Sequence, residues 1–230
     1  MKFRIVGNVV PAVEVYFEQA GEEMITQSGG MAWMSDGISM TTDTNGGALA
    51  GLGRMLAGES IFMAHYKAVR PGSTIAFAST VPGKVIPIKM KDHPNGLICQ
   101  KGAFLCSQAS VKLDIAFSRR LSSGFFGGEG FILEKLSGQG AAFLEVDGDV
   151  VEKDLSPGEV IKIDTGNVVA FQNGMLYEIE TVQGFKNILF GGEGLFLTKI
   201  TGPGKVIMQT QNISDFAKMI SNMLPNRNYQ

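Results

Sequence analysis

Apolar and polar residues alternate along most of this chain, and a period of two is typical of half-buried β-strands. The alternation is clearest in three segments, 12–18, 111–117 and 161–164. The chain also contains 30 glycines, and Pro-Gly pairs separate the alternating segments at the spacing of tight turns. Many short strands joined by such turns predict an all-β protein built from β-sandwich units.

One segment near the C-terminus has a helical period instead. Residues 214–224 carry apolar side chains at i, i+3, i+4 and i+7, which places them on one side of an α-helix: Phe216, Met219, Ile220 and Met223. Ser214 is a suitable N-cap, and Pro225 would end the helix. We therefore expect a C-terminal amphipathic helix that packs its apolar stripe on the sheets.

The chain contains an internal duplication. Residues 126–140 recur as residues 190–204, and nine of the fifteen positions are identical. A fainter third copy begins at Gly58, and the Gly-apolar turns at Gly30, Gly102 and Gly174 are 72 residues apart. Repetition at a fixed period indicates a repeated structural unit. We expect one compact body over 1–230, with units at about 1–80, 81–154 and 155–212.

Composition and charge narrow the range of functions. The 230 residues are 44% apolar and 18% charged, which is a globular composition whose low charge favours a homo-oligomer. The net charge is −2, and no basic run is longer than Arg119-Arg120, so we expect no nucleic-acid partner. The N-terminal residues do not form a signal peptide, and no apolar run approaches the roughly 20 residues that span a bilayer. We therefore expect a cytoplasmic protein.

Few side chains are suited to metal or redox chemistry. Cys99 and Cys106 could lie on paired strands if Gly102 turns the chain between them. We interpret them as small apolar thiols, with a redox or metal-binding pair as the alternative. His65 and His93, the two histidines, fall in different units, whereas a catalytic zinc site uses about three protein ligands. We interpret His65 as a strand residue and His93 as part of a solvated turn. We expect no cofactor, no metal and no catalytic residues, and hence no enzyme.

One glutamate follows a glycine in each unit: Glu59, Glu129 and Glu193. In the structural interpretation, each carboxylate accepts hydrogen bonds from backbone N–H groups freed at a glycine turn. In the functional interpretation, the three acids converge near a pseudo-threefold axis as ligand or ion contacts. Three like charges repel one another, so that arrangement needs a bound cation.

Two apolar segments are candidate interaction surfaces. The first is the glycine-rich stretch 46–58, whose side chains include Leu49, Leu52, Arg54, Met55 and Leu56. If it is exposed, it forms a patch suited to a protein or membrane-surface partner; if it is buried, it only connects two strands. The second is the pair Phe125 and Phe126, which could lie at a subunit contact.

The chain resembles the mitochondrial biogenesis (altered inheritance of mitochondria) family, whose bacterial members have no established activity. The resemblance covers nearly the whole chain and is carried by the runs 46–60, 82–88 and 191–195. The family fold is similar to the tryptophan RNA-binding attenuator protein, which implies β-sandwich units about a pseudo-threefold axis. RNA binding does not carry over, because the basic and aromatic positions of the attenuator protein cannot be matched here. The resemblance offers no catalytic residues.

These observations favour a non-enzymatic scaffold or protein-interaction protein that self-associates. The alternative is a small-ligand or ion-binding module with a site at the pseudo-threefold axis. Fold resemblance alone does not decide between the two, because one fold can carry different functions.

Overall fold

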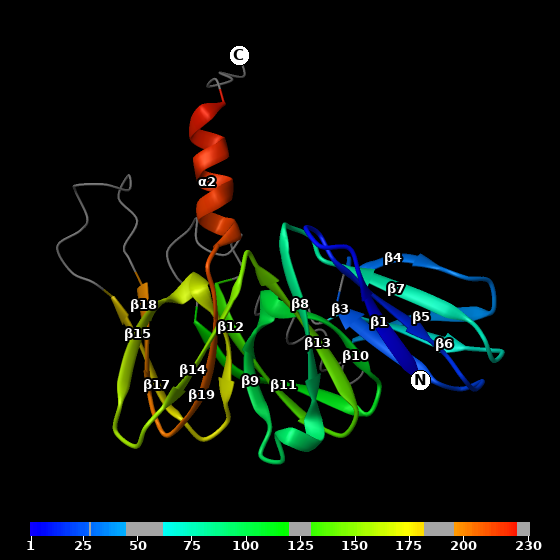
Figure 1. The fold of residues 1–230 in the computed structure, drawn as a ribbon, viewed down its shortest axis with the longest axis horizontal. Coiled ribbons are helices and arrows are strands. Elements are labelled where there is room, and N and C mark those ends of the chain that lie inside the picture. Colours follow the sequence, from blue (N-terminus) through cyan, green and yellow to red (C-terminus); the bar gives the residue numbers. More distant parts are fainter. Residues whose placement is uncertain (28, 45–61, 120–129, 182–195, 225–230) are drawn as a thin grey trace.

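The structure is a computed structural model that describes residues 1–27, 29–44, 62–119, 130–181 and 196–224 (Figure 1). These residues form antiparallel β-strands, three short 3-10 helices and one α-helix, so the predicted all-β class with a C-terminal helix is confirmed. In chain order the elements are β1 (Lys2–Val6), β2 (Ala12–Tyr16), β3 (Glu23–Gln27), β4 (Met31–Met34), β5 (Ile38–Thr44), β6 (Phe62–Ala68), β7 (Thr74–Ala78), β8 (Gly83–Lys89), η1 (Met90–Asp92), β9 (Leu97–Gln100), η2 (Lys101–Ala103), β10 (Phe104–Gln108), β11 (Val111–Arg119), β12 (Phe131–Gly138), β13 (Ala141–Asp147), β14 (Val150–Leu155), β15 (Val160–Asp164), η4 (Thr165–Asn167), β16 (Val168–Gln172), β17 (Leu176–Thr181), β18 (Phe196–Thr201), β19 (Gly204–Gln209) and α2 (Ile213–Met223).

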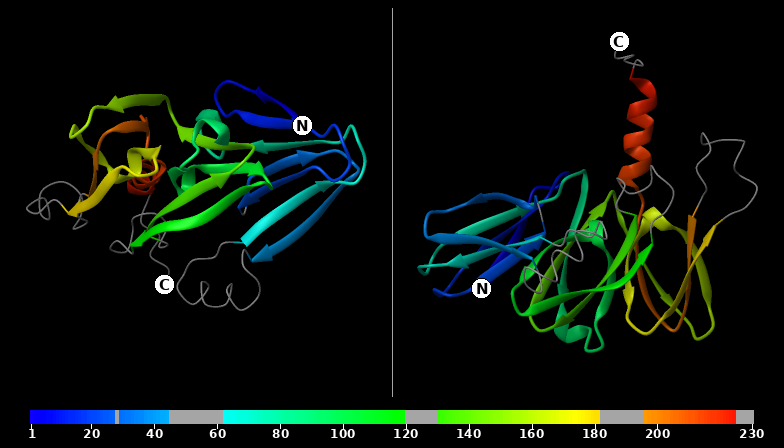
Figure 2. Two further views of the ribbon diagram at one scale, coloured as in Figure 1. Left: turned by 90° about the horizontal axis from the view of Figure 1, so that it is seen from below. Right: turned by 180° about the vertical axis from the view of Figure 1, so that it is seen from behind.

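The described strands form four sheets that follow one another in a row (Figures 1 and 2). Sheet A has the order β1-β2-β7-β4, and sheet B has the order β5-β6-β3-β10-β13-β8. Sheet C has the order β11-β12-β9-β16-β19-β14, and sheet D has the order β15-β18-β17. Every strand pair in these sheets is antiparallel, as expected for short strands joined by tight turns.

One strand scheme recurs along the chain. We call β1–β7 the first unit, β8–β13 the second and β14–β19 the third. The second unit contains the orders β10-β13-β8 and β11-β12-β9, and the third contains β16-β19-β14 and β17-β18-β15. The first unit contains β4-β7-β2 and β5-β6-β3, with β1 added beside β2. Sheets B and C are each shared between two units; the pseudo-threefold relation of the units stays a prediction.

Apolar side chains fill the three spaces between successive sheets. Phe77 of sheet A and Phe143 of sheet B belong to one buried cluster, and Leu144 of sheet B and Leu136 of sheet C belong to a second. A third cluster, which includes Phe171, lies between sheets C and D. Burial of one such side chain contributes about 1.5–3 kcal/mol, so these clusters supply the main favourable term in folding.

The glycines of the duplicated segment have a structural reason. Gly138, the last residue of β12, and Gly140, just before β13, have φ angles of 96° and 106°. In this left-handed region a Cβ atom clashes with the backbone. Glycine has no Cβ atom, so it adopts these angles at little cost. A Cβ on Gly138 would also approach the carbonyl oxygen of Ser110 to 2.5 Å.

Helix α2 differs in two respects from the sequence prediction. Its N-cap is Asn212 rather than Ser214: the Asn212 Oδ1 accepts a hydrogen bond of 3.0 Å from the Ser214 backbone N–H. The helix also projects away from the sheets instead of packing on them (Figures 1 and 2). None of the three buried clusters includes a residue of α2. An amphipathic pattern predicts that one face needs a cover, but it does not say which surface provides it.

Candidate functional site

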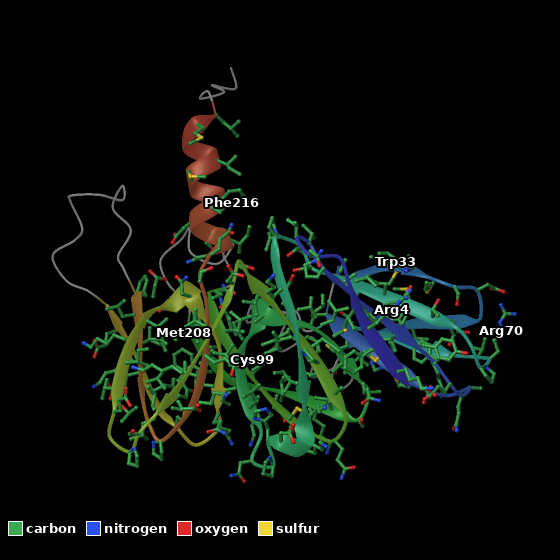
Figure 3. The ribbon with its side chains drawn as sticks, in the orientation of Figure 1. Arg4, Trp33, Arg70, Cys99, Met208 and Phe216 are labelled. Carbon is green, nitrogen blue, oxygen red and sulfur yellow. The ribbon has the colours of Figure 1, made fainter. Side chains whose placement is uncertain are left out.

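Within the part of the chain that the structure describes, one face of helix α2 is an exposed apolar surface with a regular pattern. Five side chains on it are open to solvent, with exposed fractions between 38% for Phe216 and 74% for Met223: Ile213, Phe216, Met219, Ile220 and Met223. Figure 3 shows Phe216 on the helix, beyond the ends of the strands. Isolated helices of this length are marginal in water, and an amphipathic face normally stabilises a helix by packing on a partner. The stripe is therefore a candidate contact surface.

Sheet A carries a second group of exposed apolar side chains. Trp33 and Met34 on β4 are 47% and 40% exposed, and Figure 3 shows Trp33 on this sheet, away from the helix. Phe3 and Ile5 on β1 and Tyr16 on β2 are also exposed. Phe3 lies opposite the buried Val15 and therefore on the other face of the sheet from Tyr16, so these side chains do not form one patch; soluble monomers expose single apolar residues routinely.

A cavity with both polar and apolar lining residues lies at the base of helix α2. Its volume is about 410 Å³, and residues of the first and second units and the start of the helix line it, among them Gln27, Gln100, Glu145 and Ser214. A smaller cavity of about 70 Å³ shares Glu145 and Ser214 and reaches Asp147. The larger volume falls within the range of small-molecule sites, so this cavity is a candidate ligand site.

The carboxylates of Glu145 and Asp147 are held by hydrogen bonds to neighbouring segments. The Ser79 hydroxyl and the Thr80 backbone N–H donate to the Glu145 Oε2 at 3.0 and 2.9 Å. The Ile213 backbone N–H donates to the Asp147 Oδ2 at 3.0 Å, which ties β13 to the first turn of α2. Burial raises the pKa of Asp147, the hydrogen bond from Ile213 lowers it and the negative charge of Glu145 raises it.

Glu134 on β12 is the most unusual titratable group among the described residues. Its side chain is 1% exposed, and burial raises its pKa from 4.5 to about 7, while the Gln27 hydrogen bond and the charge of Lys101 lower it. The Gln27 Nε2 donates to the Glu134 Oε1 at 2.6 Å, and Gln27 also lines the larger cavity. The Glu134 Oε2 is buried without a hydrogen-bond partner among the described atoms. A buried carboxyl with a raised pKa is a common mark of a functional position.

The interaction and acidic residues predicted from the sequence lie outside the described residues. They are Leu49, Leu52, Arg54, Met55, Leu56, Phe125, Phe126, Glu59, Glu129 and Glu193. Their segments connect β5 to β6, β11 to β12 and β17 to β18, which are strand pairs at the same place in each unit's scheme. The predictions that concern them stay predictions.

The cysteines and histidines do not form the arrangement that a metal or redox site needs. Cys99 lies on β9 of sheet C and Cys106 on β10 of sheet B, so the expectation that they could share a strand pair is wrong. Both are free and buried, and burial raises the pKa of each thiol. Across the described residues, no three His, Cys, Asp or Glu side chains are grouped in a way that could hold a metal ion.

The two histidines have different surroundings. His65 lies on β6, as expected for a strand residue, and its Nδ1 is 2.6 Å from the Glu23 Oε1. His93 is partly buried rather than solvated: its Nδ1 is enclosed without a described partner, and burial lowers its pKa. Its neighbours Asp92 and Pro94 are exposed, so the turn itself is solvated and only the His93 side chain is partly enclosed.

Sequence reasoning missed Glu134, Glu145 and Asp147. Glu134 follows three consecutive apolar residues, 131–133, and such a run is typical of a strand covered on both faces. A charge placed within such a strand is a signal that could have identified Glu134 as buried. Glu145 and Asp147 carry no comparable signal, because the helix turn that contacts Asp147 is distant in sequence.

Comparison with known proteins gives the family of this chain. An uncharacterised protein of Streptococcus pyogenes serotype M6 is 28% identical over 223 residues, which cover 94% of this chain and 87% of that protein. An X-ray crystal structure of a Streptococcus pyogenes protein, a structural genomics target, has a TM-score of 0.76 at 26% identity and covers 97% of this chain and 99% of that one. The model of the family described as mitochondrial biogenesis AIM24 matches residues 3–211. The chain therefore belongs to the mitochondrial biogenesis AIM24 family.

Proposed function

We propose that this protein is a non-enzymatic scaffold that self-associates. The observation that carries this proposal is the uncovered apolar face of helix α2, which projects from the sheets (Figure 1). An apolar helix face left in water loses the stabilisation that burial provides, and a second copy of the chain offers the same face in a self-complementary contact. The helix surface thus suits a contact between copies.

A cytoplasmic location is part of the proposal. Both cysteines are free thiols, which is the usual state of cysteine in a reducing compartment. In the part of the chain that the structure describes, no helix has the length and apolar character needed to cross a bilayer.

The helix contact can be tested by the double substitution Phe216→Ser and Ile220→Ser. These side chains are 38% and 43% exposed, and covering the exposed fractions would contribute about 0.6–1.3 kcal/mol each. Because both copies in a self-complementary contact carry the two substitutions, the loss counts twice, and self-association is expected to weaken by roughly 60- to 6,000-fold in dissociation constant. Light scattering over a concentration series measures this against the mass of one chain, 24.6 kDa.

The matched control is Ser221→Ala, on the same helix but outside the apolar stripe. It should leave the dissociation constant unchanged. A wild-type protein that stays at the mass of one chain at every concentration would refute the proposed self-association. An unchanged dissociation constant for the double variant would remove the helix from the contact.

A small-ligand or ion-binding module is the second candidate function. Gln27 lines the larger cavity at the base of α2 and bonds the buried Glu134, whose second oxygen has no described partner. Divalent cations or small polar molecules bound there would raise the melting temperature of the purified protein. A melting temperature that is insensitive to Mg²⁺, Ca²⁺ and Mn²⁺ would argue against the ion-binding form of this function.

A further inference from the structure

Sheets A and D lie at the two ends of the row. In the described part of the chain, each has an edge strand with a free side, and the strands at the same position in the other units pair with a neighbouring unit on that side. Within the chain, β3 of the first unit pairs β10 of the second, and β9 of the second pairs β16 of the third. In the common scheme, β15 corresponds to β3 and β9, and β4 corresponds to β10 and β16. Among the described strands, β15 pairs only β18, and β4 pairs only β7.

We propose that β15 of one copy pairs antiparallel with β4 of a second copy, which joins sheet D of the first to sheet A of the second. The joined sheet would have the order β17-β18-β15-β4-β7-β2-β1, which is the order of sheets B and C with β1 added. This inference rests on the proposed self-association and gives it a second contact, at the two strand edges, besides the face of helix α2. Strand edges are sites where further chains add, because their backbone groups lack partners.

Irregular pairing at one position supports the correspondence of β4 with β10 and β16. The register of β4 with β7 shifts between Met31 and Trp33. The register of β10 with β13 shifts between Phe104 and Cys106, and that of β16 with β19 shifts between Val168 and Ala170. Each shift lies at the same place in its strand, and bulges are features that a fold keeps. The three strands therefore correspond residue by residue: Trp33, Cys106 and Ala170.

The side chains at the two free strand edges are more exposed than those where two units pair within the chain. We call such a pairing of strands from two units, or from two copies, a joint. Cys106 and Ala170, on strands with partners on both sides, are fully buried, whereas Trp33 at the corresponding position of β4 is 47% exposed. On the other edge, Ile98 of β9 is buried, whereas Lys162 at the corresponding position of β15 is exposed. Positions that are covered where two units pair within the chain are thus open to solvent at the two free edges, at Trp33 and at Lys162.

The β10–β3 and β16–β9 pairings also predict which residues of β4 and β15 lie opposite each other in the proposed contact. Ser107 lies opposite Ile25, and Phe171 lies opposite Ile98. Ser107 and Phe171 each follow the corresponding bulge position by one residue, as Met34 does on β4. Ile98 precedes Ser107 by nine residues in its own unit, and Lys162 precedes Phe171 by the same nine. The transferred register therefore places Met34 of the second copy opposite Lys162 of the first, and Ser35 of the second copy opposite Ile161 of the first.

The joint uses different surfaces on the two copies, so it is heterologous. Such a contact repeats until the assembly closes into a ring or extends as a filament. Each copy would supply one β15 and one β4, and a closed ring would leave neither edge free.

The experiment mixes two variants of the full chain, each with one added cysteine, and oxidises them. Met34→Cys with Lys162→Cys tests one opposed pair, and Ser35→Cys with Ile161→Cys tests the next; adjacent pairs in an antiparallel ladder differ in spacing, so one of the two has the closer geometry. The expected result is a disulfide-linked pair of chains in at least one mixture. Neither variant should cross-link alone, because Cys99 and Cys106 are buried.

The matched control shifts the register. Met34→Cys with Val160→Cys moves the second cysteine by two positions, beyond the roughly 7 Å between Cα atoms that a disulfide can bridge. Equal cross-linking in the control mixture would overturn the proposed register. No cross-link in either test mixture, with a wild-type mass above that of one chain, would overturn the joint while leaving self-association intact. A wild-type protein with the mass of one chain would overturn both.

A disruptive variant gives an independent readout. Trp33→Glu places a charge at the free edge of β4, where the side chain is already half exposed, so the fold should persist. It should reduce the mass measured by light scattering. Val151→Glu on the outer edge strand β14, 43% exposed, is the matched control and should not reduce it. A mass that falls equally in both variants, or in neither, would contradict the proposal.

Discussion

Replacing the buried Glu134 by glutamine should stabilise the protein, and the gain should depend on pH. The pKa of Glu134 is raised from 4.5 to about 7, mainly because burial disfavours the charged form. Glutamine is neutral at every pH and keeps an oxygen that can accept the 2.6 Å hydrogen bond from the Gln27 Nε2. The substitution therefore removes the cost of ionisation and preserves the one described contact.

The sign and size of the effect follow from proton linkage. Below pH 4.5 the carboxyl is protonated in both the folded and the unfolded chain. Between pH 4.5 and about 7 the unfolded chain releases the proton while the folded chain retains it, so the free energy of unfolding falls as the pH rises. Each pKa unit is worth about 1.4 kcal/mol, so this shift amounts to about 3 kcal/mol above pH 7. Below pH 4.5, wild type and Glu134→Gln should be almost equally stable.

Urea unfolding at several pH values between 4.5 and 8 measures this difference. The stability of Glu134→Gln relative to wild type should rise across the window and then level off. Glu178→Gln, at an exposed carboxylate that pairs with Lys199 at 3.2 Å, is the matched control and should change stability by less than about 1 kcal/mol at every pH. Parallel curves for wild type and Glu134→Gln would refute the reasoning, because they would mean that Glu134 ionises as easily in the folded chain as in water.

Two further predictions concern the core. Phe171→Ala should lower the free energy of unfolding by about 3–5 kcal/mol, because Phe171 is fully buried and its ring lies 5.2 Å from that of Tyr177; a loss below about 1 kcal/mol in urea unfolding would contradict its place in the core. Cys99 and Cys106 should not react with a thiol reagent until urea unfolds the chain, because both are buried and burial raises their pKa; rapid labelling of the native protein would favour the redox alternative.

The strands could be predicted from the sequence because their pattern is local. Alternation in 111–117 marks β11, and the duplication of 126–140 at 190–204 marks the strand and turn that become β12 and β18 with their glycines. The pairing of units could not be predicted, because β3 meets β10 through contacts between residues more than 80 positions apart. Alternation shows that a strand has two different faces, but it does not say which strand lies beside it.

The candidate sites were harder to predict than the fold. The helix was expected from the spacing of Phe216, Met219, Ile220 and Met223, yet its exposure depends on where the last strand ends and in which direction the chain leaves the sheet. The Glu134 environment depends on Gln27, which comes from another unit. Each of these features arises from contacts between distant parts of the chain, and no local pattern encodes them.

Because sheets B and C are each shared between two units, they determine how the molecule unfolds. Separation of the first and second units would part β3 from β10 in the middle of sheet B. Both fragments would then have a strand edge with unpaired backbone N–H and C=O groups. Neither unit can therefore unfold without removing strand pairing from the neighbouring unit. We expect the three units to unfold together in one cooperative transition. Fragments cut at unit boundaries should aggregate rather than persist as independent domains.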